Sequence, residues 1–190
     1  QAREQKKIDD ADVANTKAQQ ALRDKQEILR EKELVHIELT DSRAELVSQL
    51  DEAKLTQKES KETVREYEKQ VKNANTAVDK ADKAWRKELE KTKRNELKEQ
   101  WTVDKKAATT IKNELTKAIK ALEVADKSVN DLNKKIEALD AKIKKAKQAV
   151  TVANREVISA RTAADKTQAK LDALRGVQAD EQSTTDTNAD

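Results

Sequence analysis

Residues 115–174 read LTKAIKALEVADKSVNDLNKKIEALDAKIKKAKQAVTVANREVISARTAADKTQAKLDAL. Apolar residues recur here at alternating four- and three-residue steps, with Thr167 as the single exception. This spacing is the a and d pattern of a heptad repeat, and it lasts for about eight heptads, where three or four already indicate a coiled coil. The seam positions are Leu115, Ala118, Leu122, Ala125, Val129, Leu132, Ile136, Leu139, Ile143, Ala146, Val150, Ala153, Val157, Ala160, Ala164, Thr167, Leu171 and Leu174.

The composition agrees with a long helical protein that has few turns. Of the 190 residues, 41 % are charged and 2 % are aromatic, and the chain has one glycine and no proline. Because glycine and proline are the usual turn residues, few chain reversals are expected. A disordered chain is also rich in charge, but it does not keep an apolar seam in register. The sequence therefore predicts an all-α fold.

Several classes of function are disfavoured by the same composition. The chain has no cysteine, which excludes a disulfide framework and thiolate metal sites. Its net charge of +3 is spread over interspersed acidic and basic residues, so we expect no nucleic-acid binding. No apolar run approaches the ~20 residues of a membrane span and no signal peptide is visible, so we expect no membrane insertion. The chain begins with Gln1 rather than Met, which suggests a processed protein or an excised fragment.

The first half of the chain carries its own heptads, from Ile8 to Trp85. This seam is apolar near both ends and polar in the middle, where we expect a softer segment. The polar seam residues there are Lys25, Lys32, His36, Arg43, Gln57 and Ser60. His36 is the only histidine, and a single histidine supplies too few ligands for a metal site. We therefore expect no metal, no cofactor and no catalytic residue in this chain.

The two seams do not continue into each other between Trp85 and Trp101. Their separation is two heptads plus two residues, which turns the apolar stripe by roughly 160° to the opposite side of a straight helix. A chain reversal removes this conflict, so the sequence predicts a long antiparallel two-helix coiled-coil hairpin. At 1.5 Å per residue, the hairpin would be about 120 Å long, with both chain ends at one end.

The expected boundaries follow from where the seams stop and from the available turn residues. Asn95 is the best candidate for a left-handed or N-cap conformation, and Gly176 is placed as a helix stop. The hairpin would cover residues 1–176, and the polar, aperiodic segment 177–190 would be a disordered acidic tail or linker. Within the hairpin, we expect arm 1 at about 2–91, the turn at about 92–95 and arm 2 at about 96–175.

Side-chain sizes favour one pairing of the two arms. Layers such as Val64 with Ala125, and Ala53 with Ile136, match a large residue with a small one, as close packing at even helix spacing requires. The pattern also allows a shift of one heptad in either direction. We expect a monomer at micromolar concentration with a weak tendency to form a homodimer, and the sequence leaves a swapped dimer open.

Two sets of residues are candidates for binding a protein partner. Trp85, Arg94 and Trp101 flank the expected turn, and exposed tryptophans are common binding anchors. The alternative for the tryptophans is that they plug the end of the seam. Leu34 and Ile37 lie off the seam and could contact a further helix, although scattered exposed apolar residues are normal.

Two segments of the sequence also resemble known bacterial proteins. Residues 141–174, AKIKKAKQAVTVANREVISARTAADKTQAKLDAL, resemble the coiled-coil stalks of Gram-positive surface proteins of the surface-exclusion and adhesin types. Residues 11–22, ADVANTKAQQAL, are similar, more weakly, to the receptor-binding hairpins of colicin-type bacteriocins. No cell-wall sorting signal, killing domain or TonB box occurs in this sequence. The resemblance implies an extracellular or cell-surface stalk.

Together these patterns lead to two functional hypotheses and to the expectation that the chain is not an enzyme. The first is a non-catalytic stalk and binding module of a secreted or surface-exposed bacterial protein, which presents the hairpin tip to a receptor or other protein. The second is an intracellular, cytoplasmic scaffold that recruits partner helices along its flank. Catalysis is not expected because a two-helix rod offers no enclosed site for preorganised groups.

Overall fold

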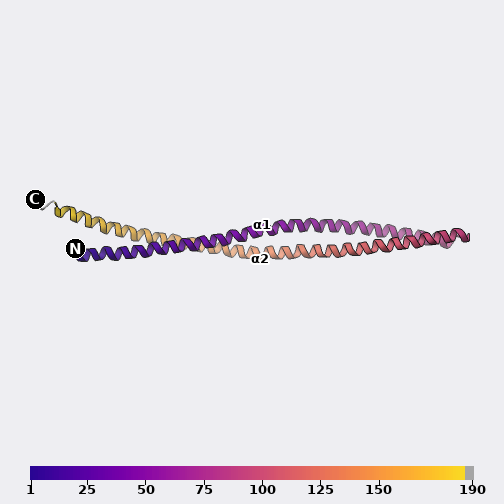
Figure 1. Ribbon diagram of the computed structural model, residues 1–190, viewed down its shortest axis with the longest axis horizontal. Helices are drawn as coiled ribbons and strands as arrows, with labels where there is room; N and C mark the ends of the chain where they lie inside the picture. Colours follow the sequence, from indigo (N-terminus) through magenta and orange to yellow (C-terminus); the bar gives the residue numbers. More distant parts are fainter. Residues whose placement is uncertain (187–190) are drawn as a thin grey trace. The chain divides into compact units, whose positions relative to one another are not determined.

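The computed structural model describes residues 1–186, and in these residues the chain forms two long helices and no strand. Helix α1 spans Ala2–Lys87 and helix α2 spans Lys91–Asp186 (Figure 1). The predicted all-α helical hairpin is confirmed. Residues 187–190, the last part of the expected tail, lie outside the described residues.

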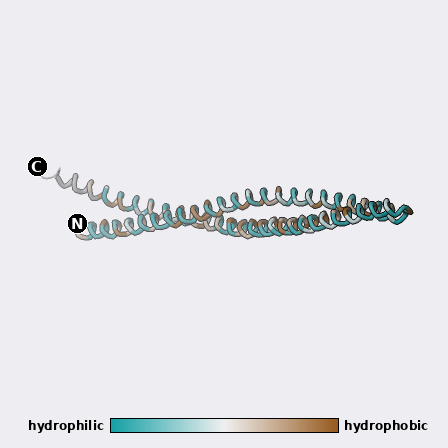
Figure 2. Tube along the Cα trace, turned by 45° about the vertical axis from the view of Figure 1, so that its right-hand side comes forward, coloured by the Kyte–Doolittle hydropathy of each residue, from teal (hydrophilic) through white to brown (hydrophobic). Residues whose placement is uncertain are grey.

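The chain divides into two compact units, and each unit contains a part of both helices. The first unit consists of Gln1–Ser42 and Leu139–Asp190, and the second consists of Arg43–Ala138. In each unit a part of α1 lies beside a part of α2 with the opposite chain direction (Figure 1). Along both helices, short hydrophobic patches alternate with hydrophilic ones (Figure 2). This is the pattern expected when one narrow stripe of each helix is buried.

The core of the first unit is a small apolar cluster close to the N-terminus. Ile8, Ala11 and Leu171 are buried together, and Leu174 packs against them. The second unit has a corresponding cluster in which Leu50, Val129 and Ile136 are buried. Leu46, Val47, Ala53 and Leu132 surround this second cluster. All of these residues except Val47 occupy predicted seam positions, so the heptad pattern locates the core correctly.

The pairing of the two arms differs by one heptad from the pairing that side-chain size favours. Leu50 is clustered with Val129 and Ile136, which places it opposite Leu132 rather than opposite Leu139. In the first unit, Ala11 lies with Leu171 and Asn15 contacts Thr167, which is the same offset. This offset is one of the two single-heptad shifts that the sequence pattern allows.

A polar layer in the first unit explains why this pairing prevails. Asn15 is only 8 % exposed, and its Nδ2 donates a hydrogen bond to Oε1 of Gln168 at 2.7 Å. The hydroxyl of Thr167 donates to Oδ1 of Asn15 at 3.0 Å. In the size-matched pairing Asn15 would face Leu174 and lose both of its partners on α2, whereas Thr167 would keep the hydrogen bond of its hydroxyl to the Ala164 carbonyl at 2.9 Å. Burying the Asn15 amide against leucine without these partners costs about 1–3 kcal/mol, which disfavours the size-matched pairing.

The polar positions in the middle of the α1 seam also reach across to α2. Nζ of Lys25 lies 3.0 Å from Oε2 of Glu156 in the first unit. In the second unit, Nε2 of Gln57 donates to Oδ1 of Asp126 at 2.7 Å. These side chains bridge the helices at the edge of the seam, as expected for long polar residues at core positions.

The turn lies at residues 88–90, several residues before the expected position at 92–95. Asn95 is inside α2, and no described residue has a positive φ, so the expected left-handed turn is not used. The Glu88 carboxylate accepts a hydrogen bond from the backbone N–H of Glu90 at 3.0 Å. The carbonyl of Glu90 then accepts the N–H of Arg94 at 2.9 Å and begins α2. A turn held by the Glu88 side chain thus replaces the reversal at Asn95 that we expected.

The expected helix stop at Gly176 is wrong, because α2 continues through this residue to Asp186. Gly176 has no positive φ, and a Cβ atom at this position would meet no other atom within 4 Å. Glycine weakens a helix by about 1 kcal/mol relative to alanine but ends it only when the backbone enters the left-handed region. Much of the segment expected to be a tail is therefore helical.

The pairing of the arms can be tested by disulfide trapping, because the chain has no cysteine of its own. We expect Ala53→Cys with Val129→Cys to oxidise readily to an intramolecular disulfide. Ala53→Cys with Ile136→Cys should not, because one heptad adds about 10 Å along the axis and disulfides need Cα atoms about 4–7 Å apart. Non-reducing electrophoresis measures the outcome. Trapping of the second pair alone would show that the size-matched pairing is the real one.

The polar layer makes a second prediction about stability. Asn15→Ala should lower the free energy of unfolding by about 1–2 kcal/mol, because a buried hydrogen-bonded group is lost. Replacing both Asn15 and Thr167 with leucine should restore stability to within about 1 kcal/mol of the original, because no unpaired polar group remains. Urea denaturation followed by circular dichroism measures both values. Gln20→Ala, at an exposed position, is the control and should change little, and an equal loss there would contradict the assigned role.

Candidate partner-binding site

The two tryptophans meet beside the turn, within the second unit. Trp85 lies in the last turn of α1, and Trp101 lies in the third turn of α2. Their ring centroids are 5.7 Å apart and their planes are tilted by 43°. Both side chains are half-buried. The sequence correctly indicated that these residues lie near the turn, and their half-burial agrees in part with each of the two roles that it suggested.

Hydrogen bonds fix the orientation of Trp85. Oδ1 of Asp82 accepts from Nε1 of Trp85 at 3.2 Å and from Nε of Arg86 at 2.9 Å. The three residues are three and four positions apart on one helix, so they are neighbours on its surface. Asp82 therefore holds the indole and partly neutralises Arg86.

Three basic side chains lie over the indole rings. Cζ of Arg86 is 5.0 Å and Nζ of Lys98 is 5.5 Å from the ring centroid of Trp85. Nζ of Lys105 is 4.5 Å from the ring centroid of Trp101. These distances fall in the range of cation–π contacts, worth about 0.5–1 kcal/mol each at exposed sites. We call the set Trp85, Arg86, Lys98, Trp101 and Lys105 the tryptophan patch.

Trp101 differs from Trp85 in that its indole N–H has no acceptor. Among the described residues, its Nε1 is the one buried side-chain polar atom without a hydrogen-bond partner. Native proteins contain few such groups. The tryptophan patch thus contains one indole held by a hydrogen bond, Trp85, and one whose N–H has no hydrogen-bond acceptor within residues 1–186, Trp101.

Leu89 is an exposed apolar residue at the turn that the sequence analysis missed. It lies between the two helices and is 95 % exposed, the highest exposure among the large apolar residues described. Its sequence signal was available: a leucine outside the heptad pattern, directly between two acidic residues. The basic residues of the tryptophan patch were also missed, because their relation to the rings depends on how the arms pair.

The other predicted binding residues do not join the tryptophan patch. Arg94 is exposed in the first turn of α2, and its contact in the described structure is made by its backbone N–H. Leu34 and Ile37 belong to the first unit, lie three residues apart on α1, and are each 53 % exposed. Val35, at 47 %, adds to this exposed apolar segment.

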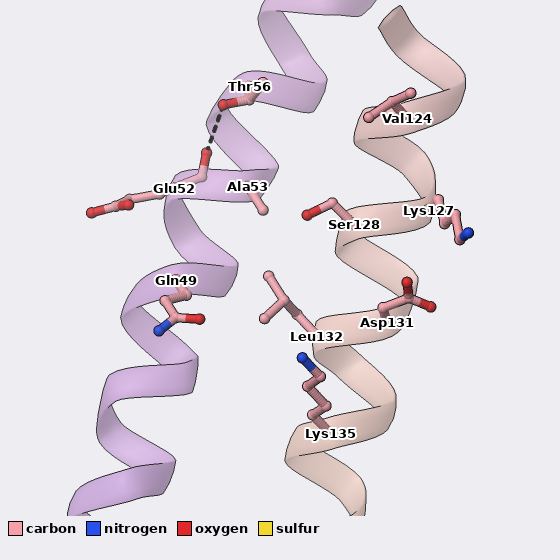
Figure 3. Close-up of a pocket in the computed structure, with 10 residues that line it drawn as sticks. All are labelled: Gln49, Glu52, Ala53, Thr56, Val124, Lys127, Ser128, Asp131, Leu132 and Lys135. Carbon is pink, nitrogen blue, oxygen red and sulfur yellow. Dashed lines mark hydrogen bonds between the residues drawn. The ribbon is translucent and has the colours of Figure 1, made fainter. Parts of the chain in front are cut away.

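The second unit also contains an open groove between its helices (Figure 3). It encloses about 580 Å³ where the small side chains of Ala53 and Ser128 leave space above Leu132. Glu52 points away from the groove, and its backbone carbonyl accepts a hydrogen bond from the Thr56 hydroxyl (Figure 3). The lining mixes both signs of charge and has no focus of one chemistry. The residues that line it are Gln49, Glu52, Ala53, Thr56, Val124, Lys127, Ser128, Asp131, Leu132 and Lys135.

Comparison with known proteins gives no indication of function. No protein-family model, curated protein or solved structure was found to match this chain. Within residues 1–186, neither helix has a segment that is long and apolar enough to cross a lipid bilayer. In the same part of the chain, no three His, Cys, Asp or Glu residues group in a way that could hold a metal ion.

The contact between the indoles predicts an energetic coupling. In a double-mutant cycle with Trp85→Ala and Trp101→Ala, we expect a coupling energy of about 0.5–1.5 kcal/mol, the range of aromatic pairs. Urea denaturation monitored by circular dichroism gives the four unfolding free energies. As a control, Trp101→Ala and Leu50→Ala are not in contact and should be additive. A coupling of zero between the tryptophans would contradict the ring contact described above.

Proposed function

We propose that the chain is a non-catalytic stalk and binding module of a secreted or surface-exposed bacterial protein, with the tryptophan patch as its contact for a protein partner. The observation that supports this most is the pairing of two indoles under basic side chains beside a turn with an exposed leucine. Tryptophan and arginine are enriched among the residues that dominate binding energy at interfaces.

The topology also supports this function. The turn and the tryptophan patch belong to the second unit, whereas the N-terminus and the C-terminal part of α2 belong to the first. A hairpin of this kind can be inserted into a longer chain through its ends, while its turn carries a binding surface. The bacterial surface location rests on the resemblance of residues 141–174 to Gram-positive stalks.

A second candidate function is favoured by a different surface. Leu34 and Ile37 are each 53 % exposed, and they are neighbours on one face of α1. A scaffold that recruits partner helices along its flank in the cytoplasm would use residues of this kind. We place this candidate second because scattered exposed aliphatic residues are common on monomeric proteins, whereas tryptophan is enriched among the residues that dominate binding energy at interfaces.

The two candidates are separated by a capture experiment. The purified hairpin is used as bait for the surface fraction and for the cytosol of the source cell, and bound proteins are identified by mass spectrometry. Trp85→Ala with Trp101→Ala should remove at least nine-tenths of the capture from the surface fraction. Leu34→Ser with Ile37→Ser should leave this capture unchanged. Leu55→Ser, another exposed apolar residue, is the matched control.

Each alternative result has a definite meaning. Loss of capture with the Leu34 and Ile37 variant, and not with the tryptophan variant, would replace the first function with the scaffold. No capture from either fraction would show that the chain is a passive stalk. Circular dichroism of every variant confirms that lost capture is not lost folding.

A further inference from the structure

We propose that the tryptophan patch binds an acidic helical segment of a protein partner, with carboxylates of that segment pairing with Lys98 and Lys105. This inference rests on the proposed function, because it specifies the chemistry of the partner at the same surface. It is carried by the charge balance around the indoles, by the spacing of the two lysines and by the exposed Leu89.

In the part of the chain that the structure describes, some basic side chains near the indoles are paired with carboxylates, and others are not. Arg86 is paired with Asp82 at 2.9 Å, and near the turn Lys93 is paired with Glu90 at 3.4 Å. For Lys98 and Lys105, the contacts that the structure describes are with the indole rings rather than with carboxylates. A cation held over an aromatic face keeps its positive charge and its remaining hydrogen-bond donors available. These two lysines therefore offer charge that a partner can neutralise.

The spacing of the lysines limits the shape of that partner. Lys98 and Lys105 are one heptad apart and share a heptad position, so they project from one face of α2 about 10 Å apart along the axis. Trp101 lies between them in sequence. Two glutamates one heptad apart on a partner helix have the same spacing. In coiled coils, charged residues that flank the seam form salt bridges between helices and determine which helices pair. An apolar side chain between these glutamates would face the indoles.

Leu89 adds an exposed apolar side chain in the turn, four residues after Trp85. A leucine that is 95 % exposed gains little from its position in the free protein. Covering it would favour binding, because apolar surface is removed from water. The tryptophan patch and Leu89 together thus match a partner with both carboxylates and aliphatic side chains.

A membrane surface or a nucleic acid fits this surface less well. Binding to a polyanion requires a broad stripe of uncompensated basic residues. Here Glu88, Glu90, Glu96 and Glu99 lie among the basic residues around the turn. These four glutamates would repel an extended negative surface, but they do not prevent Lys98 and Lys105 from forming two separate ion pairs with a partner. The observations therefore favour a protein segment.

The test uses the full chain and its intrinsic fluorescence, because Trp85 and Trp101 are its only tryptophans. The probe is an acetylated and amidated alanine-rich helical peptide with two glutamates one heptad apart and leucines between them. We expect a saturable change in tryptophan emission that weakens as salt is raised from 50 to roughly 500 mM, because exposed ion pairs are screened. A peptide with glutamine in place of both glutamates, and one with the glutamates on opposite faces, should bind at least fivefold more weakly.

Variants of the chain locate the contact. Lys98→Gln with Lys105→Gln should weaken binding of the acidic peptide about five- to tenfold, the effect of losing two exposed ion pairs. Lys120→Gln with Lys134→Gln removes the same charge from exposed positions elsewhere in the second unit and should leave binding unchanged. Leu89→Ser should weaken it by a smaller factor.

Three results would overturn the inference. These are equal binding of the glutamine peptide, binding that is unaffected by the Lys98 and Lys105 variant, and no emission change at millimolar peptide. Competition by a DNA duplex or by anionic phospholipid vesicles at equal charge concentration would also overturn it, in favour of a general anion surface. The capture experiment, repeated with the Lys98→Gln and Lys105→Gln variant, distinguishes this inference from the proposed function. If capture needs the tryptophans but not the lysines, the proposed function stands and the acidic partner does not.

Discussion

The buried amide of Asn15, hydrogen-bonded to Gln168 and Thr167, distinguishes the observed pairing of the two arms from the pairing one heptad away. A shift by one heptad exchanges one apolar layer for another, so the aliphatic residues alone discriminate poorly between pairings. The polar layer has no equivalent seven residues away, because the residues that would face Asn15 and Thr167 are leucines. The same offset brings Leu132 to Leu50 in the second unit. Burial of a few polar atoms thus favours the observed pairing over the one that side-chain size favours.

Much of the fold follows from the sequence, and the parts that do not have physical causes. The heptads locate the seam, and the change of face between Trp85 and Trp101 requires a reversal. Side-chain size led to the wrong pairing because it ignored Thr167, the one polar residue of the second seam. The turn lies earlier than expected because the Glu88 carboxylate accepts the N–H of Glu90, a contact that needs neither glycine nor asparagine. Gly176 does not end α2 as expected, because its backbone does not adopt the positive φ of a glycine helix stop.

The candidate site was predictable in its aromatic residues and not in its charges. Tryptophans are rare in this chain, and their positions beside the turn single them out at once. The contacts of Lys98 with Trp85 and of Arg86 with Asp82 depend on side-chain conformations and on which residues of the two arms face each other. Such contacts between charges and rings have no signature in a sequence that is 41 % charged, because every segment contains similar lysines. Leu89 could have been noticed, since it interrupts the heptads.

The hairpin topology also has a consequence for how the chain folds. Contacts between the arms join residues 69 positions apart at Gln57 and Asp126, and 153 positions apart at Asn15 and Gln168. Each doubling of the loop that a contact closes costs about 0.6 kcal/mol of chain entropy, so pairing starts most easily next to the turn. Once the first layers have formed, each further layer closes only a short additional loop, and the arms pair progressively toward the chain ends. With no proline in the chain, no prolyl isomerisation delays this process. We therefore expect the tryptophan patch to assemble before the layers around Asn15 and Gln168.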